Sequence, residues 1–375
     1  MIYLDNGATS FPKPPTVYEA IEAYIKYCGG SAGRGAHRKT REAMEIATRC
    51  RCLAAELMGV KNPEEIIFVK NATEGLNTII KGMVKRGDKV VVSPLEHNAV
   101  IRPLTELGAV ISVLPLNDRG ETATEYLEGL DEDVSLVVLN HVSNVSGAVC
   151  DIQNAARLCN EAGVPLVVDC SQSAGHILTD AEMLGVSVVA PGHKGLLGPQ
   201  GTGIMYLHKI KPQALCFGGT GSSSESFYQP DILPDYYESG TLNMMGISGL
   251  LKGIEYVKSN FSSIAEKEME LTSLLREGLG NMNRVKIVAP NLQEYGAVVS
   301  FTVDRAEPSD IAYLLDAKYD IAVRSGLHCA PCAHKAYGTL NGGTVRISPG
   351  PFNTPREIKT TLDAVNSIIN HGAGL

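Results

Sequence analysis

A lysine lies between two apolar, β-branched stretches near the middle of the chain. The first stretch is Val186–Val189 and the second is Ile204–Leu207. Lys194 follows the first stretch and leads into a glycine-rich loop, which indicates strand, lysine, loop and strand. Burial and neighbouring charges can make such an amine nucleophilic. Taken alone, this pattern is more typical of a surface lysine in a turn. The residues found elsewhere in the chain favour a lysine that forms a Schiff base with a carbonyl compound.

Polar side chains recur where other apolar, strand-like runs end. They are His97, Asn144, Asp169, Gln172 and His193. In open α/β sheets, ligands bind at the carboxyl ends of the strands. We therefore expect these side chains to converge with Lys194 on one crevice.

A helix begins directly after the strand predicted at residues 65–69. Ala72 and Thr73 stand at its first positions, and the helix is expected to continue to about Val84. Free backbone N–H groups and the positive end of the helix dipole make such a start an anion site. Thr73 as a simple helix cap is the alternative, and the two interpretations are compatible.

Strand-like and helix-like patterns alternate through the first two thirds of the chain. Strands are predicted at residues 65–69, 89–92, 110–114, 135–139, 164–168, 186–189 and 204–207. This alternation predicts an α/β fold with a mostly parallel, doubly wound sheet. The segment from Phe217 to Pro234 is predicted to be a long irregular excursion, which in a compact domain is usually functional.

The last third of the chain has an α+β pattern. A helix that begins near Met245 is expected to leave the large domain around Lys252. Further helices are predicted at residues 262–279, at 309–317 and from 355, and strands at 285–288 and 297–303. We therefore predict a large domain of residues 16–252 and a smaller α+β domain of residues 1–15 and 253–375.

Composition restricts the class of protein. The chain has 375 residues, 44% of them hydrophobic, and a formal net charge of -8. This charge argues against binding to nucleic acid or to an anionic membrane surface, because both require clustered Lys and Arg. No apolar run reaches the roughly 18 residues of a membrane span. Nine cysteines without regular spacing fit a reducing compartment, so a cytoplasmic location is expected.

A glycine-rich loop precedes the second predicted helix. It covers Gly29–His37 and carries the polar side chains Arg34 and His37. Loops of this kind can line a site, although a plain connection is at least as common. His37 is accordingly retained as a candidate for substrate binding.

These motifs together resemble the class V aminotransferase family of pyridoxal-phosphate enzymes, and most closely its group II cysteine desulfurase and selenocysteine lyase branch. The resemblance covers nearly the whole chain. Its motifs are, in order, YLDNGAT, ATEGLN, EHNA, HVSN, VVDCSQ, GHKGLLGPQGTG, ESGTLN, AVRSGLHCA and VRISPGPFNT. It implies the fold type I of these enzymes, with a large domain and a smaller α+β domain, and pyridoxal 5'-phosphate as the cofactor.

The resemblance implies specific roles around the cofactor ring. Lys194 would attach the cofactor covalently, and Asp169 would pair with the pyridinium nitrogen so that the ring can act as an electron sink. His97 resembles the histidine that stacks on the ring. Gln172 resembles the residue that contacts the phenolic oxygen.

The resemblance also implies a phosphate site. Thr73, the backbone N–H of Ala72 and His193 would contact the phosphate, while Thr241 resembles the threonine that reaches the phosphate of the neighbouring subunit. This last role implies a homodimer. The family usually has a serine where this chain has Pro191. One hydroxyl contact to the phosphate is then lost, and a lower cofactor affinity is expected.

Substrate binding is implied for two further residues. Asn144 and Arg346 would hold the substrate carboxylate, the arginine through a planar, two-pronged set of hydrogen bonds. Arg324 is an additional candidate. Without the resemblance, Arg346 would be interpreted as a surface charge.

The segment around Cys329 has three interpretations. It resembles the short group II loop whose cysteine attacks the substrate sulfur, with Arg324 and His328 as electropositive neighbours that favour a thiolate. Alternatively, Cys329, Cys332 and His334 could bind zinc, although these ligands are crowded and lack a second pair. The third interpretation is an ordinary buried or turn cysteine. Cys332 itself has no assigned role.

The resemblance implies that sulfur is removed from L-cysteine to give L-alanine and a persulfide on Cys329, with no metal. The alternatives are a selenocysteine lyase that acts on L-selenocysteine, and a class V aminotransferase or lyase that acts on another amino acid. A non-catalytic scaffold that binds partners is a further alternative. A separate protein that accepts the sulfur or selenium is also expected.

Overall fold

A mostly parallel sheet forms the centre of the larger part of the molecule. The computed structural model describes residues 1–33, 35–131 and 133–371. Within them the sheet has seven strands in the order β2-β8-β7-β6-β5-β3-β4. The strands are β2 (Ile66–Val69), β3 (Lys89–Val92), β4 (Val110–Val113), β5 (Val134–Asn140), β6 (Leu166–Asp169), β7 (Ser187–Pro191) and β8 (Gly203–Tyr206). Only β8 runs antiparallel to its neighbours, so the predicted α/β fold is confirmed.

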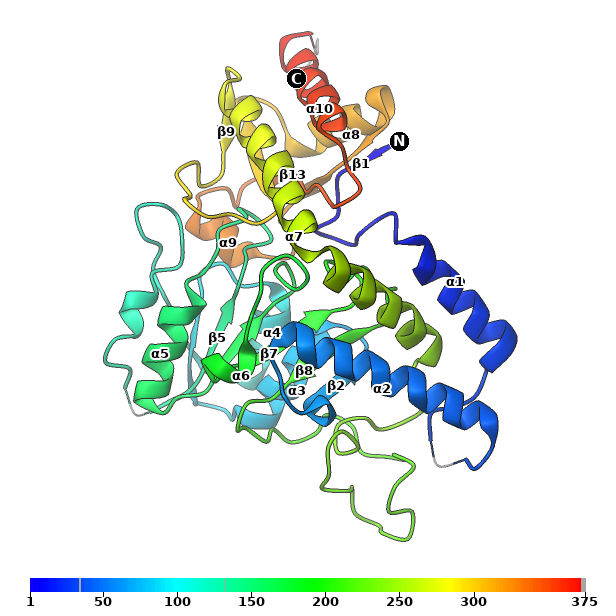
Figure 1. Cartoon of the computed structure of the whole chain (residues 1–375). Coiled ribbons are helices and arrows are strands. Elements are labelled where there is room, and N and C mark those ends of the chain that lie inside the picture. Colours follow the sequence, from blue (N-terminus) through cyan, green and yellow to red (C-terminus); the bar gives the residue numbers. More distant parts are fainter. Residues whose placement is uncertain (34, 132, 372–375) are drawn as a thin grey trace.

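Helices cover both faces of this sheet (Figure 1). They are α1 (Pro15–Ala23, extended by a π-helical turn at Tyr24–Cys28), α2 (Arg38–Met58), α3 (Ala72–Met83), α4 (Asn98–Leu107), α5 (Ile152–Ala162) and α6 (Ala181–Leu184), with 3₁₀ turns at Pro63–Glu65 and Thr124–Leu127. Successive residues of β5 point to opposite faces. Leu136 and Val138 pack in the core beneath α3 and α4, whereas Val137 and Leu139 pack in the core beneath α2 and α5. Burial of both faces explains the continuous apolar runs of these strands.

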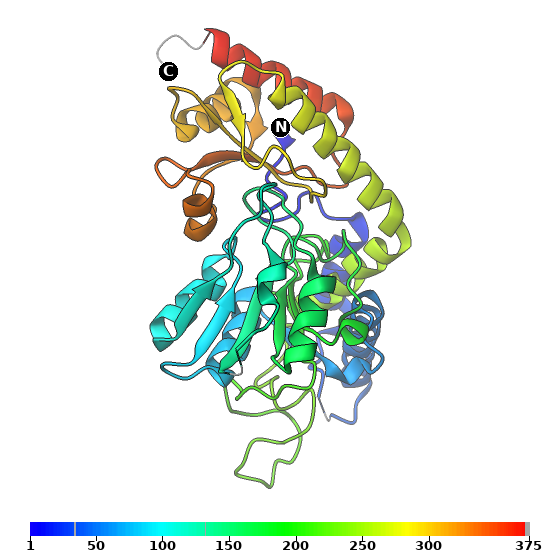
Figure 2. The same ribbon diagram turned by 90° about the vertical axis from the view of Figure 1, so that its left-hand side faces the viewer.

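One long helix connects the two parts of the molecule. Helix α7 runs from Met244 to Gly280, and its only non-helical backbone angles are at Asn260. The kink at Asn260 divides α7 into two helical halves, which correspond to the helices predicted near residue 245 and at 262–279. No loop separates the two halves. Figures 1 and 2 show α7 passing from the sheet layer to the smaller lobe.

The smaller lobe is built around a second sheet with the order β12-β13-β10-β9, antiparallel throughout. Its elements are β9 (Val285–Ile287), β10 (Val299–Val303), α8 (Pro308–Tyr319), β11 (Ile321–Ala322), β12 (Arg324–Gly326), α9 (Pro331–Ala336), β13 (Thr344–Ile347) and α10 (Pro355–His371). The first strand of the chain, β1 (Ile2–Tyr3), pairs with β11. Leu4 consequently packs with Phe301 in the core of this lobe. The domain boundaries at residues 15/16 and 252/253 stay a prediction.

The predicted irregular excursion projects from the end of the molecule that lies opposite the smaller lobe (Figures 1 and 2). Residues 217–234 contain no helix or strand. In the part of the chain that the structure describes, no helix is both long and apolar enough to span a membrane.

A buried ion pair fixes the end of this excursion to the large core. The carboxylate of Glu238 accepts hydrogen bonds from Arg51 of α2 and, at 2.6 Å, from the backbone N–H of Phe68. The side chains of Arg51 and Glu238 are only 10% and 5% exposed. Arg49, one half-turn earlier in α2, makes a comparable pair with Glu255 but is 57% exposed.

We predict that Arg51→Ala lowers the free energy of unfolding by about 3–5 kcal/mol, because it leaves a buried carboxylate without its partner. Arg49→Ala is the matched control and should cost less than about 1 kcal/mol, since exposed pairs contribute little. Urea unfolding followed by circular dichroism measures both. Equal losses for the two variants would show that burial does not determine the strength of these pairs.

Candidate active site

A cavity of about 220 Å³ lies at the carboxyl edge of the parallel strands and is lined by residues of both lobes. It brings together most of the predicted site residues. They are Ala72, Thr73, His97, Asn144, Asp169, Gln172, His193, Lys194, Arg324, Cys329 and Arg346, with Pro191 also in the wall. Thr241 and His37 do not line it.

Lys194 follows the end of β7 and reaches into this cavity. Its backbone carbonyl accepts a hydrogen bond of 2.9 Å from Ser10 Oγ. Burial lowers the pKa of its amine to about 8, opposed by the charge of Asp169 and reinforced by that of Arg346. A substantial share of the amine is therefore neutral, and nucleophilic, near physiological pH.

Asp169 is the last residue of β6 and is 5% exposed. Its Oδ1 accepts a hydrogen bond of 2.9 Å from the backbone N–H of Ser171. Gln172 lies in the turn that follows, where its Nε2 donates to the carbonyl of Gly7 at 2.9 Å. These contacts place a carboxylate and an amide on the same wall of the cavity.

The N-terminus of α3 forms the opposite end of the cavity, with Ala72 and Thr73 in its lining. The helix cap is Asn71, whose Oδ1 accepts from the N–H of Glu74 at 2.9 Å. The interpretation of Thr73 as the cap is therefore wrong, and its exposed side chain is available to a ligand. His193 adds a buried Nδ1 that has no hydrogen-bond partner within the described residues.

His97 caps α4 and faces the cavity. Its Nδ1 accepts a hydrogen bond of 3.0 Å from the N–H of Ala99. Burial lowers the pKa of His97 to about 4, although Asp169 opposes this effect. The ring is therefore neutral at pH 7, which suits packing against an aromatic ligand.

Cys329 lies in the short loop between β12 and α9, and the loop is fixed at three points. Asn144 Nδ2 donates to the carbonyl of His328 at 2.7 Å, and the N–H of Asn98 donates to the carbonyl of Cys329 at 2.7 Å. His328 Nε2 lies 2.9 Å from Thr344 Oγ1. Both His328 and Cys329 have left-handed backbone angles, with φ of 48° and 58°. This rare conformation turns the thiol side chain toward the cavity.

The expectation that His328 is an electropositive neighbour of the thiol was wrong. The residue is 4% exposed, and burial together with the charge of Arg346 lowers the pKa of its imidazole to about 2. His328 is therefore neutral and acts as a buried anchor of the loop. Arg324 supplies the positive charge instead, with its Nη2 at 4.0 Å from Cys329 Sγ.

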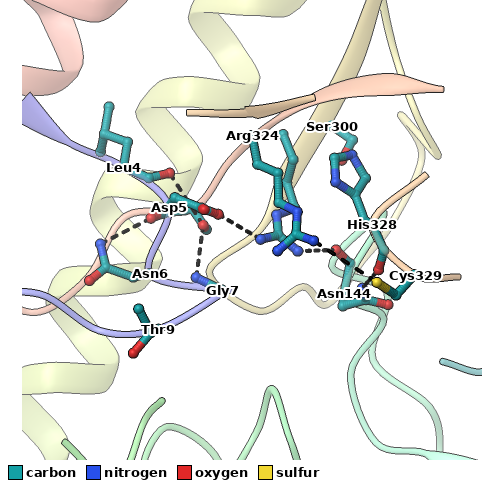
Figure 3. Close-up of polar contacts among 12 residues, drawn as sticks. Leu4, Asp5, Asn6, Gly7, Thr9, Asn144, Ser300, Arg324, His328 and Cys329 are labelled. Carbon is teal, nitrogen blue, oxygen red and sulfur yellow. Dashed lines mark hydrogen bonds and ion pairs between the residues drawn. The ribbon is translucent and has the colours of Figure 1, made fainter. Parts of the chain in front are cut away.

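Figure 3 shows Asn144, His328 and Cys329 at one end of a polar cluster and residues 4–7 at the other, with Arg324 between them. Arg346 belongs to the same cluster, where Nη1 donates to the carbonyl of Asn144 at 3.1 Å and Nη2 pairs with Asp5 Oδ1 at 2.7 Å. Sequence reasoning missed Asp5. The YLDNGAT motif was the available signal, but no property of that motif alone connects it to a residue 341 positions away.

Several N-terminal residues were also missed. Gly7 and Ala8 line the cavity, and Ser10 N and Lys13 Nζ donate to the carbonyl of His193 at 3.0 and 2.8 Å. The opening segment of the chain therefore fixes the backbone that carries Lys194.

Nothing in the described residues favours the zinc interpretation of the cysteine segment. Among the described residues, no three His, Cys, Asp or Glu side chains are grouped as metal ligands. His334 is buried in α9 and its Nδ1 lies 2.8 Å from Thr339 Oγ1. Burial raises the pKa of the Cys332 thiol, so this residue stays protonated at neutral pH.

Two candidate residues lie elsewhere in the molecule. Thr241 is exposed and lines a second cavity of about 160 Å³, beside β8 and the start of α7. His37 is exposed and caps α2, where its Nδ1 accepts from the N–H of Thr40 at 3.3 Å. Arg34, from the same glycine-rich loop, lies outside the described residues.

Comparison with known proteins identifies the family of the chain. The family model "Aminotransferase class-V" matches residues 2–360. The chain belongs to the aminotransferase class-V family. A protein of Methanothermobacter thermautotrophicus named "Probable cysteine desulfurase" is 32% identical to this class-V chain, over 99% of this chain and 95% of that protein. A protein of Pyrococcus abyssi with the same name is 33% identical, over 98% and 94%.

Solved structures of similar proteins have the same architecture as this class-V chain. The apo structure of a cysteine desulfurase from Thermococcus onnurineus superposes with a TM-score of 0.90 at 34% identity, covering 98% of this chain and 94% of that one. The cysteine desulfurase CsdA from Escherichia coli gives 0.85 at 26% identity, covering 97% and 93%.

The lowered pKa of Lys194 predicts a pH-dependent stability. The unfolded amine titrates near 10.5 and the folded amine near 8. Below pH 8 the folded state therefore contains a buried ammonium group, which lowers the free energy of unfolding. This loss of stability decreases between pH 8 and 10.5, because the amine becomes neutral in the folded state first. Lys194→Met should accordingly raise the free energy of unfolding, most strongly below pH 8.

The measurement is urea unfolding of both proteins from pH 7 to 10, after hydroxylamine dialysis to remove bound carbonyl compounds. The gain from Lys194→Met should shrink as the pH rises. A gain that stays constant across this range would contradict a buried, titrating amine.

Proposed function

We propose that the protein is a pyridoxal 5'-phosphate-dependent cysteine desulfurase, which converts L-cysteine to L-alanine and receives the sulfur on Cys329. The observation that carries this proposal is the shared cavity of Lys194, Arg346 and Cys329. It combines an amine for the cofactor, a guanidinium for a carboxylate and a thiol for the departing sulfur. The names of similar proteins support the same activity.

The residues present fit this cofactor. Lys194 provides the amine for covalent attachment, and Asp169 provides a buried carboxylate for the pyridinium nitrogen. The start of α3 and the free Nδ1 of His193 provide donors for the phosphate. Bound there, pyridoxal 5'-phosphate supplies an electron sink for the bonds at the substrate Cα. Pro191 provides no hydroxyl, so the phosphate depends on the other donors.

The protein side chains bind the substrate and move its protons. Arg346 binds the substrate carboxylate, and Asn144 lies beside it. Lys194 Nζ accepts the proton of the substrate Cα, which its lowered pKa permits. The neutral ring of His97 packs over the cavity and excludes water from this step.

Cys329 receives the sulfur. The attacking form is the thiolate, and Arg324 places a positive charge near it. A bond forms between Cys329 Sγ and the substrate sulfur, while the substrate Cβ–S bond breaks and leaves its electron pair on carbon. Protonation of that carbon gives alanine, and Cys329 becomes a persulfide. No external oxidant or reductant is needed.

An acceptor must then remove the sulfur from Cys329. The side chain is exposed and also borders two outer hollows, formed by α4 with the β12–α9 loop and by α4 with α3. This exposure supports transfer to a separate acceptor protein. All nine cysteines are free, which supports a reducing, cytoplasmic location.

The decisive assay measures alanine release from L-cysteine and L-selenocysteine. We predict that Cys329→Ala loses activity on L-cysteine, because no thiol accepts the sulfur. The variant should retain much of any activity on L-selenocysteine, because a selenol is already deprotonated at neutral pH and selenium can leave without a nucleophile.

Cys332→Ala is the matched control and should retain activity on both substrates, while Lys194→Ala should lose both and also the visible absorbance of the bound cofactor. Alanine release from L-cysteine at the wild-type rate by Cys329→Ala would refute its role as the sulfur acceptor.

A homodimer is part of the proposal. Thr241 does not line the cavity of its own subunit but is exposed next to a loop with protruding apolar side chains, among them Phe227 and Tyr228. Such side chains support a subunit interface, through which Thr241 would reach the phosphate site of the partner.

Light scattering should therefore give twice the 40.0 kDa mass of the chain. Thr241→Ala should leave this mass unchanged and weaken cofactor retention, measured as absorbance lost on dilution, because one phosphate contact is removed. A monomeric wild type would contradict the role of Thr241.

A further inference from the structure

Two arginines lie directly opposite each other on neighbouring strands of the smaller lobe. Arg324 of β12 and Arg346 of β13 are register partners, and both line the cavity. Like charges directly opposite each other on two strands destabilise a sheet. The repulsion acts at a buried position, because Arg346 is 1% exposed. An anion must therefore balance this pair in the folded protein.

Asp5 is that anion. Its Oδ1 pairs with Arg346 Nη2 at 2.7 Å. No other ion pair within the described residues includes Arg346, and none includes Arg324. The cluster of two arginines and one aspartate thus keeps one net positive charge, which matches a ligand with a single carboxylate.

The hydrogen bonds that Arg346 makes within the protein do not use all of its N–H donors, so some remain for the carboxylate of a ligand. Its Nη1 donates to the carbonyl of Asn144, while its Nε is buried and has no hydrogen-bond partner in the part of the chain described. A guanidinium carries five N–H donors. Asp5 occupies one end of the planar group, so the remaining donors are held in a fixed orientation at the cavity wall.

The backbone around Asp5 is itself held in place. The N–H of Ala8 donates to the carbonyl of Asp5 at 3.0 Å, and the N–H of Gly7 donates to Ser348 Oγ at 2.9 Å. Gly7 passes so close to the guanidinium that a Cβ there would lie 3.3 Å from Arg346 Cζ. Ser348 is two residues after Arg346 on the same segment. The segment that carries Arg346 and Ser348 therefore holds the backbone next to Asp5. Asp5 in turn orients the guanidinium of Arg346.

We propose that Asp5 is a positioning residue for the carboxylate subsite. It orients the guanidinium of Arg346 and offsets the repulsion from Arg324, so that Arg346 binds the α-carboxylate of the amino acid substrate. The inference rests on the proposed function for the class of substrate. It extends that function to a residue that touches neither the substrate nor the cofactor.

The test compares the affinity of the purified holoenzyme for L-alanine and for L-alaninamide, which lacks the carboxylate, by titration calorimetry. The wild type should prefer L-alanine. Asp5→Ala should weaken L-alanine binding about tenfold, as expected when a charge-assisted hydrogen bond that orients the arginine is lost. Binding of L-alaninamide should stay unchanged, because it does not depend on the orientation of Arg346.

Two further variants separate positioning from folding. Asp5→Asn keeps the size and an acceptor oxygen, so it should fold and weaken L-alanine binding about threefold, since a neutral acceptor gives a weaker bond. Asp304→Ala removes an exposed carboxylate that pairs with Lys286 in the same lobe, and it should leave both affinities unchanged.

Unchanged or tighter L-alanine binding in Asp5→Ala or Asp5→Asn would overturn the proposal, because Asp5 would then be a bystander or a competitor for Arg346. Equal weakening of both ligands would also overturn it, since this indicates a general disturbance. A wild type that prefers L-alanine but releases no alanine from L-cysteine would refute the proposed desulfurase activity and still support the carboxylate subsite.

Discussion

The balance of charge in one partly closed cavity is the constraint on which the site depends. A lysine, two arginines and two aspartates contribute to it. The pKa of Lys194 depends on the charges of the other four residues, which are Asp169, Arg346, Arg324 and Asp5. In a medium of low polarity these interactions are much stronger than in water. Because burial disfavours the ammonium form, the amine becomes reactive, while the carboxylates prevent its pKa from falling further. The imidazoles of His97, His193 and His328 are neutral in this environment and add no charge.

The two lobes contribute different parts of this balance. The large lobe supplies Lys194, Asp169 and the start of α3, while the smaller lobe supplies both arginines and the thiol. The first residues of the chain connect the two, since Asp5 pairs with Arg346 and Ser10 holds the carbonyl of Lys194. The geometry of the site therefore requires that these opening residues be docked against both lobes.

The sequence predicted the main sheet well, because its strands are buried on both faces and have continuous β-branched runs such as Val90–Val92. It also placed most of the cavity residues, since strand ends converge in such sheets. The short strands β11, β12 and β13 were not predicted, because runs such as Thr344–Ile347 contain polar residues that only the tertiary fold buries. The pairing of Asp5 with Arg346 and the neutral state of His328 depend on contacts between distant segments, and no local pattern encodes them.

The kink at Asn260 has a mechanical consequence for the cavity. The part of α7 beyond it spans about 30 Å, at about 1.5 Å per residue, so a bend of about 5° at this point moves the far end of the helix by about 3 Å. The half before the kink packs in the large core, and so does Ile264 just after it, whereas Leu271, Leu275 and Leu279 pack in the small core. A different angle at Asn260 would therefore shift the small core relative to the large one. The hydrogen bonds that Asn98 and Asn144 of the large lobe make to the Cys329 loop oppose such a shift.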